Sequence, residues 1–527
     1  MKRISGIPEF VFVYLLFFIF FLFTLASNFS GPHDSIGYLN GIAYGSGLFH
    51  QHHLLYHFIT HYWLVAVKAV IPGVADYYLV EAFTALWGSA SLAVAYCILR
   101  NRFAQPVGLS LAAISVIAFS YGMWFYSVNI EVYAPPMFFL LAALYILSDP
   151  AFGQRDVWKV ALLHSAAILF HQVHILFSVT ILYILWQHRQ KINLPKAIVQ
   201  YAAIGIVLVG GAYFIVGWMV EGQNSFAKWM LWLQGYAAGD DYWVAPSLKM
   251  PLYVATGLSH AFIGGHFVFK LPVVNSFLAK AAGEHSLADE LYLVRDMGEG
   301  MAIFLTVLSL LLAAMMLWLS IRFIAKYATL RKSYGYGLRP LMVTAIVYSI
   351  FFCFWEPEIL EFWIFQTVLF WVMLLGTLMH GRGHFPFRMK PAAGVVFMAV
   401  CLFLINFLGS IRYLLNLEND LYYVKTEPVK NAVQPGDAVL LQDGWILKDF
   451  LKYYTRADVL EVPQSDTARM RVDNFINTHL QKNAKLYIYP EGRAGHDNTE
   501  YIDSVLAANT GRWRVFHAEN PKVYIIE

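Results

Sequence analysis

The chain has 527 residues, of which 59% are hydrophobic, 17% are aromatic and only 13% are charged. An average soluble domain has about 25% charged residues, so this composition excludes a soluble enzyme and equally a disordered or collagen-like chain. The net charge of +3 gives no reason to expect nucleic acid as a partner. All three cysteines lie inside apolar runs, which excludes a disulfide scaffold and a CxxC metal or redox site. The composition therefore predicts a polytopic membrane protein.

Apolar segments along the chain predict about eleven transmembrane helices, because a span takes about 20 mostly apolar residues. The segments lie near residues 9–27, 79–99, 107–126, 134–148, 157–170, 172–186, 197–218, 301–321, 340–355, 359–379 and 391–411. The fifth and sixth are short and share one apolar run, which favours a helical hairpin that does not need to cross the whole bilayer. The first follows two basic residues, but its apolar run is at the long limit for a signal peptide, so we expect an anchor.

Lysines and arginines in the short loops predict the orientation, because such residues accumulate on the cytoplasmic side. With a cytoplasmic N-terminus, the inner loops hold Arg100, Arg102, Arg155, Lys159, Arg189, Lys191, Lys196, Arg322, Lys326, Arg331, Lys332, Arg339, Arg382, Arg388 and Lys390. This arrangement requires residues 52–72 to form an interfacial helix on the outer side. We expect a multi-pass protein of the inner (cytoplasmic) membrane, with outer loops at 28–78 and 220–300. The apolar run 250–274 grazes or enters the membrane, and the sequence leaves that choice open.

After the last span the composition changes. We expect a membrane domain at 1–412 and a separate periplasmic domain at 413–527. In the latter, strand-like runs at 438–441, 459–462, 486–489 and 523–526 alternate with helical patterns at 445–455, 467–482 and 499–508. This alternation predicts a small soluble α/β domain around a largely parallel sheet.

Ionisable residues near a membrane are costly unless they are paired or functional, and here they gather on the predicted outer side. Asp34 follows the first span by a few residues. A carboxylate there suits a general base that takes a proton from an incoming hydroxyl. The alternative is structural, since Asp34 followed by Ser35 can cap the helix that carries Tyr38.

A histidine-rich segment follows in the same loop, with His50, His52, His53, His57 and His61. The last three recur every four residues and would share one helix face, and two histidines at that spacing can bind zinc. No HExxH motif accompanies them. Contacts to a substrate phosphate or sugar, and plain packing at the interface, are equally open interpretations.

Glu131, with Tyr133 beside it, stands at the outer end of the third span, between aromatic residues and a double proline. Taken alone, Glu131 is either a site residue or a solvated helix end. His171 and His174 lie near the outer tip of the short hairpin, and His164 lies deeper. For these histidines the alternative is a core position in which neighbours satisfy their hydrogen bonds.

Two outer segments complete the polar set. Glu356, Glu358 and Glu361 lie in the turn between spans nine and ten, where a simple polar turn beside an aromatic belt residue is the alternative. The 220–300 loop holds aromatic residues that either stack on a sugar ring or lie on the bilayer surface, namely Trp229, Trp232, Tyr236, Tyr242 and Trp243. Its Asp240-Asp241 pair favours a turn over a metal site. Together the polar clusters share one membrane face, as a single active site requires.

The order of these features resembles the GT-C superfamily of polytopic membrane glycosyltransferases, which includes the protein O-mannosyltransferases and the aminoarabinose transferases of lipid A. The resemblance covers most of the membrane part. It rests on His33-Asp34, the histidine-rich segment His50 to His57, Trp124…Glu131-Val132-Tyr133 and His171-Gln172-Val173-His174, of which Glu131-Val132-Tyr133 is the most specific. The chain departs from the family pattern because Ser35 follows Asp34 where relatives carry an Asp-Glu pair, and because the Pro-Pro-Gly step is missing.

The resemblance implies a sugar donor carried on a polyprenyl phosphate, used on the periplasmic side with inversion at the anomeric carbon. Asp34 would be the general base, and Glu131 would orient Asp34 or the acceptor. The expected substrate-binding residues are His50, His52, His53, His57, Tyr133, His171, His174, Glu356 and Glu361. Candidate partners of the donor phosphate are Lys249, Lys270, Arg295 and Arg412. A divalent metal is not required in the O-mannosyltransferase-like branch, although oligosaccharyltransferase relatives use one.

The leading hypothesis is therefore a lipid-phosphate-sugar-dependent glycosyltransferase acting on a protein, lipid or glycan acceptor within membrane lipid. Two alternatives stay open. A transporter or flippase of lipid-linked material would place charge near mid-span and show broken helices or repeated halves, and we find neither clearly. A non-catalytic membrane assembly component is the other. The sequence does not identify the sugar, the acceptor or the oligomeric state.

Overall fold

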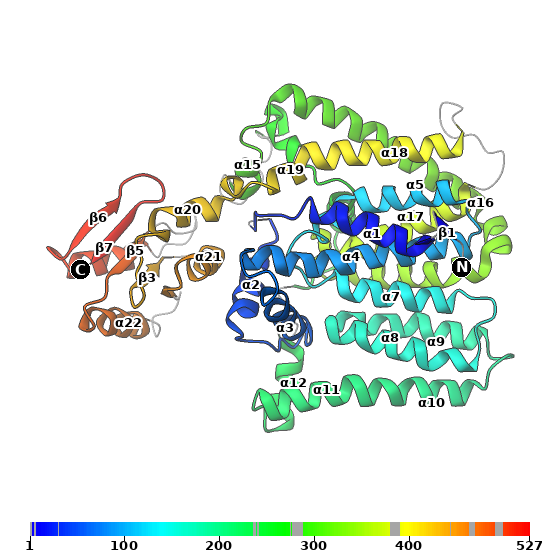
Figure 1. Ribbon diagram of the computed structural model, residues 1–527, viewed down its shortest axis with the longest axis horizontal. Coiled ribbons are helices and arrows are strands. Elements are labelled where there is room, and N and C mark those ends of the chain that lie inside the picture. Colours follow the sequence, from blue (N-terminus) through cyan, green and yellow to red (C-terminus); the bar gives the residue numbers. More distant parts are fainter. Residues whose placement is uncertain are drawn as a thin grey trace. The chain divides into compact units, whose positions relative to one another are not determined.

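The computed structural model describes residues 3–4, 7–29, 31–235, 239, 242–274, 276, 288–379, 390–442, 444–462, 469–490 and 499–526. The chain divides into two compact units (Figure 1). The helical unit consists of Met1–Leu25, Gly47–Phe267 and Gly300–Arg412, and the C-terminal unit of Ala26–Ser46, Val268–Glu299 and Tyr413–Glu527. The predicted domain bounds, 1–412 and 413–527, stay a prediction. Asp240 and Asp241, together with Tyr236, Arg382 and Arg388, lie outside the described residues.

The helical unit begins with a short antiparallel pair of strands and continues as a succession of helices. The strands are β1 (Arg3–Ile4) and β2 (Ile7–Pro8). The helices before the large loop are α1 (Glu9–Leu22), α3 (Tyr56–Lys68), α4 (Asp76–Asn101), α5 (Val107–Phe119), α6 (Tyr121–Phe125), α7 (Ala134–Leu147), α8 (Val157–Phe170), α9 (Phe177–Gln187), α10 (Leu194–Gly205) and α11 (Gly211–Phe214). The 220–300 segment contains α12 (Phe226–Gln234) and α13 (Met250–Phe262), and the helices that follow are α16 (Glu299–Phe352), α17 (Ile364–Leu378) and α18 (Pro391–Asn406). The prediction of a polytopic helical protein is confirmed.

Five described helices are long and apolar enough to cross a membrane. They are Asp76–Asn101, Leu194–Val220, Glu299–Phe352, Leu360–Leu378 and Pro391–Leu414, and shorter apolar helices lie at Glu9–Leu22, Val107–Phe119, Ala134–Leu147 and Gln172–Gln187. The predicted span 301–321 and most of the predicted span 340–355 lie in α16, which consists of two helices joined at a kink where Tyr334 has non-helical dihedral angles. The chain is a multi-pass membrane protein, whereas the count of eleven crossings and the orientation stay predictions.

Buried polar side chains join several helices of the helical unit. The Arg100 guanidinium on α4 lies 2.9 Å from the Glu9 carboxylate at the start of α1. The Asn406 side chain donates to the carbonyl oxygens of Phe119 (2.7 Å) and Phe262 (3.0 Å) and accepts from the Gly264 amide (3.0 Å). Buried polar groups require such partners. These bonds therefore fix the ends of α5, α13 and α18 against one another.

The segment predicted as an interfacial helix contains α3, but the helix is shorter than expected. His53 precedes α3, so only His57 and His61 lie on it, and the predicted face shared by three histidines is wrong. The 250–274 run holds α13 and a short 3-10 helix, His266–Lys270. Whether that run enters the membrane stays a prediction.

The C-terminal unit is built on a five-stranded sheet with helices on both faces. Its strands are β3 (Ala438–Leu441), β4 (Asp458–Glu461), β5 (Leu486–Tyr489), β6 (Trp513–His517) and β7 (Val523–Ile526), in the spatial order β4-β3-β5-β7-β6. Its helices are α2 (Ser35–Tyr44), α15 (Ala288–Leu293), α20 (Leu421–Lys430), α21 (Trp445–Thr455), α22 (Arg469–Gln481) and α23 (Thr499–Ala508). The predicted α/β class is confirmed.

The sheet is mixed rather than largely parallel, which corrects the prediction. β3 pairs in parallel with β4 and β5, whereas β7 pairs antiparallel with β5 and with β6. Strand β6 was not expected from the sequence. Ala438 and Leu440 face one buried cluster and Val439 and Leu441 face the other, so β3 is covered on both sides and all four residues are apolar.

Candidate functional site

The predicted substrate-binding histidines come together in the helical unit. The rings of His50 and His53 stack with centroids 4.8 Å apart, and the His53 ring lies 5.0 Å from the His171 ring, which in turn lies 5.6 Å from the His174 ring. His53, His171 and His174 are all buried. Two segments more than 100 residues apart thus form one histidine cluster, made of the loop before α3 and the turn between α8 and α9.

Gln172 joins the two segments. Its backbone amide donates to the His52 carbonyl oxygen (2.9 Å), and its side-chain nitrogen lies 2.7 Å from His52 Nδ1. Burial lowers the pKa of His52 to about 4. Burial, together with the charges of His52 and His50, lowers the pKa of His171 to about 3. Burial also lowers the pKa of His57 to about 4. These histidines are therefore neutral near pH 7 and would act as hydrogen-bonding groups rather than as cations.

A zinc site was one interpretation of these histidines. Within the described residues, no group of three or more His, Cys, Asp or Glu side chains is arranged to hold a metal ion.

His164, on α8, lies 2.8 Å from the His174 carbonyl oxygen and 2.9 Å from the Tyr201 hydroxyl. His164 is therefore a core histidine with satisfied hydrogen bonds.

A hydrogen-bonded group around Glu361 borders the histidine cluster. The Glu361 carboxylate accepts from the hydroxyls of Tyr133 (2.6 Å) and Tyr126 (3.1 Å), and the Tyr133 ring lies 5.5 Å from the His171 ring. Glu356 lies in the same connection between α16 and α17, where its amide donates to the Tyr242 carbonyl oxygen. The structure thus places Tyr133 and Glu361 beside the histidine cluster.

Glu131 is almost fully buried, with 3% of its surface exposed, so the alternative of a solvated helix end is wrong. Its carboxylate interacts electrostatically with the hydroxyl of Tyr56, and so does that of Glu81 on α4. Glu81 has no exposed surface, and neither of its carboxylate oxygens has a hydrogen-bond partner among the residues that the structure describes. Glu81 is not among the residues predicted from the sequence, although a lone acid inside an apolar span is itself a signal of function.

Replacing Glu81 with leucine is expected to stabilise the protein, because a buried polar group without a partner costs about 1–3 kcal/mol. The melting temperature of the full chain in detergent should rise. If Glu81 serves the site, activity should fall in the same variant, since stability and function oppose each other at functional positions. The Glu81→Gln variant keeps the shape and polarity and should melt close to the wild type. A lower melting temperature for Glu81→Leu would contradict this account of the side chain.

An apolar cavity of about 500 Å³ adjoins the histidine cluster. Its polar lining comes from His52, His171, Gln172 and Gln234. Its aromatic lining comes from Tyr213, Trp229, Trp243, Phe351, Trp355 and Phe362. Two of the loop tryptophans predicted to meet a sugar or the bilayer, Trp229 and Trp243, therefore line this cavity. An apolar cavity with a few polar groups at one part of its wall suits a ligand that joins a hydrocarbon chain to a polar head.

Asp34 belongs to the C-terminal unit, where it immediately precedes α2. Its side chain makes no capping hydrogen bond and instead accepts from the Tyr38 hydroxyl at 3.2 Å. Asp34 therefore occupies the N-cap position of α2 without acting as a side-chain cap. The surrounding protein raises the pKa of Asp34, and the Tyr38 hydrogen bond and the charge of His33 oppose that shift. A raised pKa brings a carboxylate closer to the range in which a general base is effective.

Further acids of the C-terminal unit lie near Asp34 and His33, and none of them was among the residues predicted from the sequence. His33 Nε2 lies 3.0 Å from the Asp289 carboxylate on α15. Burial raises the pKa of Asp449 on α21, and the negative charge of Asp34 adds to this shift. Asp289 and Glu290 share a side-chain hydrogen bond. Burial, that bond and the charge of Asp289 raise the pKa of Glu290 to about 9.

This shift predicts a pH dependence of stability. Glu290 keeps its proton in the folded state up to about pH 9, whereas in the unfolded chain it loses the proton near its ordinary pKa of 4.5. Because the folded state binds more protons between these values, stability should fall as the pH rises through them. Melting temperatures across this range should fall less steeply for Glu290→Gln than for the wild type. Glu427→Gln, at an exposed position of α20, is the control and should keep the wild-type slope.

The candidate phosphate partners have different surroundings. Arg295 donates to the Asn419 side-chain oxygen (2.9 Å) and stacks over the Tyr292 ring, and Lys270 donates to the Arg295 carbonyl oxygen (2.9 Å). Both are thus engaged within the C-terminal unit. Lys249 precedes α13, and Arg412 opens a short helix, Arg412–Leu414, at the end of the helical unit. The choice among these four residues stays open.

The fold has been seen before, although no family model and no curated protein sequence matches the chain. The structure of ArnT from Cupriavidus metallidurans bound to undecaprenyl phosphate is similar over 98% of this chain and 97% of that one, with 13% identity and a TM-score of 0.53. The chain has the GT-C fold. The structure of an oligosaccharyltransferase from Archaeoglobus fulgidus, in a complex with zinc and sulfate, is similar over 92% of this chain and 68% of that one, with 10% identity and a TM-score of 0.46.

The GT-C fold predicted from the order of sequence features is thereby confirmed. Because the identity to ArnT is low, the similarity establishes the fold and leaves the roles of individual residues as proposals. The histidine cluster, the apolar cavity and the buried Glu131 belong to the helical unit of this fold, and Asp34 belongs to the C-terminal unit.

Proposed function

We propose that the chain is an integral membrane glycosyltransferase that transfers a sugar from a polyprenyl-phosphate carrier to a hydroxyl acceptor on the outer face of the inner membrane. The observation that carries this proposal is the GT-C fold, shared with ArnT over nearly the whole of both chains. The ArnT structure holds undecaprenyl phosphate, and a related carrier lipid is the donor proposed here. The N-terminus would be cytoplasmic and the α/β domain periplasmic.

The reaction needs one base and a leaving group that departs without help. The acceptor hydroxyl oxygen attacks the anomeric carbon while the bond from that carbon to the phosphate oxygen breaks. The phosphate leaves with the bonding electrons as polyprenyl phosphate, and the hydroxyl proton passes to Asp34. Attack from the face opposite the phosphate inverts the anomeric centre. The raised pKa of Asp34 favours this role, because the carboxylate then accepts a proton more readily.

The helical unit provides a suitable place for the donor. The apolar cavity fits isoprenoid carbons, and the neutral histidines and Gln172 in and beside its wall offer hydrogen bonds to the sugar or phosphate. Tyr133 and Glu361 extend this polar border, and His174 lines a small cavity together with them. Glu356 lies in the same connection as Glu361, between α16 and α17. Glu131 would act as a positioning carboxylate for Asp34 or the acceptor. No step in this scheme requires a metal, and a chelator should leave transfer unchanged.

Incubation of the purified full chain in lipid nanodiscs with radiolabelled polyprenyl-phosphate sugars tests the proposal. We expect release of free polyprenyl phosphate together with transfer of the label to an acceptor from a panel of lipids, glycans and peptides. Movement of intact lipid-linked sugar across a vesicle membrane, without cleavage of the sugar–phosphate bond, would instead identify a transporter. The absence of both cleavage and movement for every donor would favour a non-catalytic assembly component.

A further inference from the structure

A second cavity, of about 660 Å³ and lined by several basic residues, lies in the helical unit at the ends of α4 and α7 and beside the kink of α16 at Tyr334. Its lining includes Asn101 and Arg102 from the end of α4 and Ser148 and Pro150 after α7. The rest of the lining comes from α16, at residues 328 and 331–337 and at Arg339. None of these residues belongs to the histidine cluster or the apolar cavity. Under the predicted topology this cavity faces the cytoplasm, opposite the proposed transfer site.

Four basic side chains line this cavity, which we call the basic pocket. Arg102, Arg331, Lys332 and Arg339 line it, and no acidic residue is among its described lining. Lys191 adds a further positive charge nearby, because its ammonium group lies 5.6 Å from the centre of the Tyr336 ring, which also lines the pocket. Arg331 and Lys332 are exposed to solvent, and an anion that entered the pocket would be attracted by all of these charges.

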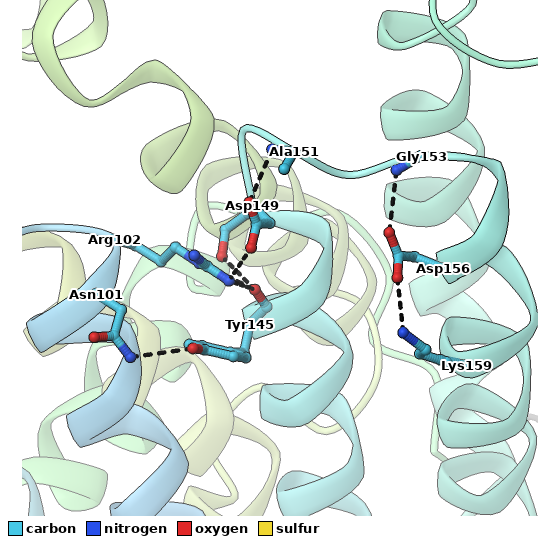
Figure 2. Close-up of polar contacts among 9 residues, drawn as sticks. Asn101, Arg102, Tyr145, Asp149, Ala151, Gly153, Asp156 and Lys159 are labelled. Carbon is cyan, nitrogen blue, oxygen red and sulfur yellow. Dashed lines mark hydrogen bonds and ion pairs between the residues drawn. The ribbon is translucent and has the colours of Figure 1, made fainter. Parts of the chain in front are cut away.

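Arg102 is held firmly by the neighbouring helix, as Figure 2 shows. Its guanidinium pairs with Asp149 at 2.8 Å, donates to the Tyr145 carbonyl oxygen at 3.0 and 3.2 Å, and lies 4.2 Å from the centre of the Tyr145 ring. Asn101 also reaches this helix, by donating to the Tyr145 hydroxyl at 3.1 Å. The charge of Arg102 is thus compensated, and its contacts make it a fixed part of the wall.

The cations on α16 are different, because Arg331, Lys332 and Arg339 form no ion pair with any residue in the described ranges. The Nε atom of Arg339 is buried and has no hydrogen-bond acceptor among them. A buried guanidinium nitrogen without an acceptor is costly, and phosphate oxygens are acceptors that arginine binds well. The structure therefore offers three uncompensated cations and one unsatisfied buried donor to an anionic ligand.

The backbone of α16 contributes to this arrangement. Tyr334 leaves the helical conformation with φ −121° and ψ 23°, and it lies between Lys332 and Arg339 in the sequence. Gly335 packs beside the Arg339 guanidinium, whose atoms lie 3.5–3.6 Å from the place that a Cβ atom would take. A Cβ atom there would make ordinary van der Waals contact with the guanidinium. The break in the helix thus coincides with the close approach of Arg339.

We propose that the basic pocket binds the phosphate group of an anionic membrane phospholipid, with Arg331, Lys332 and Arg339 as its partners. Basic recesses between transmembrane helices are recognised sites for such headgroups. The surface of α16 outside the pocket suits the acyl chains, since Ile321 and Ile324 are exposed on it. This site is separate from the proposed transfer reaction, and neither requires the other. A free phosphate ester shares the same chemistry and is separated from the lipid by the experiment below.

Native mass spectrometry of the full chain, released from nanodiscs that contain phosphatidylglycerol and phosphatidylcholine, tests the proposal. The wild type should retain phosphatidylglycerol in preference to phosphatidylcholine. Removal of each basic residue should weaken this retention roughly fivefold, the expected effect of one basic side chain near an anionic lipid. Arg331→Gln/Arg339→Gln should therefore lose most of the bound anionic lipid. Inorganic phosphate should compete with the lipid for the wild type, because both supply the same oxygen atoms.

The matched control is Arg322→Gln/Lys326→Gln, which removes the same charge from α16 at positions that do not line the pocket. It should retain phosphatidylglycerol like the wild type. Both double variants should show wild-type gel filtration and melting in phosphatidylcholine, so that a folding defect is detected separately. Equal lipid retention by the two double variants would overturn the proposal. Binding of inorganic phosphate without any preference for phosphatidylglycerol would keep the phosphate site but overturn the lipid as its source.

Discussion

Replacing Asp34 with asparagine is expected to lower the rate of sugar transfer about 100- to 10,000-fold, the range that a general base contributes. Asparagine keeps the size of the side chain and an oxygen that accepts from the Tyr38 hydroxyl, but it takes up no proton near neutral pH. Because Asp34 makes no capping hydrogen bond, α2 should stay intact. Transfer from a radiolabelled donor in nanodiscs measures the rate, and the melting temperature reports the fold.

The control for this variant is Asp76→Asn, at the start of α4. Asp76 pairs with Lys68 and has no part in the proposed chemistry, so its loss should change transfer little. Donor binding should survive in Asp34→Asn, which separates a lost proton acceptor from a lost binding site. Full transfer activity in Asp34→Asn would remove Asp34 from the mechanism while leaving the GT-C fold untouched.

Replacing Glu361 with alanine is expected to destabilise the helical unit by about 3 kcal/mol. The Glu361 carboxylate accepts from the hydroxyls of Tyr133 and Tyr126, and a hydrogen bond to a charged group is worth about 1.5–3 kcal/mol. Its loss leaves two tyrosine hydroxyls without this acceptor and frees the Tyr133 ring, which packs beside His171. Donor binding should weaken together with the melting temperature, because the border of the site loses its anchor.

Glu358→Ala is the matched control, since Glu358 lies in the same connection but is exposed. It should melt like the wild type and bind the donor normally. The Tyr133→Phe variant removes one of the two bonds and should give an intermediate loss of stability. An unchanged melting temperature for Glu361→Ala would show that these two bonds contribute little to the fold.

Local patterns determined most of the secondary structure. The apolar segments 134–148 and 157–170 contain α7 and α8, and the run 438–441 is strand β3 with the same bounds. These elements follow from the residues themselves, because burial in lipid or inside a sheet demands continuous apolar stretches. Strand β6 was missed because it lies at the edge of the sheet with its first residues exposed, and its pairing partner β7 decides its existence.

The site was foreseen in part. The histidines and Tyr133, Glu131 and Glu361 were singled out because polar residues in an apolar chain are conspicuous. Their contacts were not predictable in detail, since His53 meets His171 and Tyr133 meets Glu361 only after distant segments pack. Asp289 beside His33 and Asp449 near Asp34 were not predictable either, because no sequence pattern around these two acids distinguishes them.

The sequence by itself thus determined the membrane class, the helical and α/β elements and the set of polar residues available for chemistry. Each of these depends on composition and on periodicity over a few turns of chain. Only the tertiary structure decided that Glu131 is buried, that Glu81 has no hydrogen-bond partner within the described residues, and that basic residues from α4 and α16 line one pocket. Burial, partnership and shared cavities are properties of packing between segments far apart in the chain, and local patterns do not encode them.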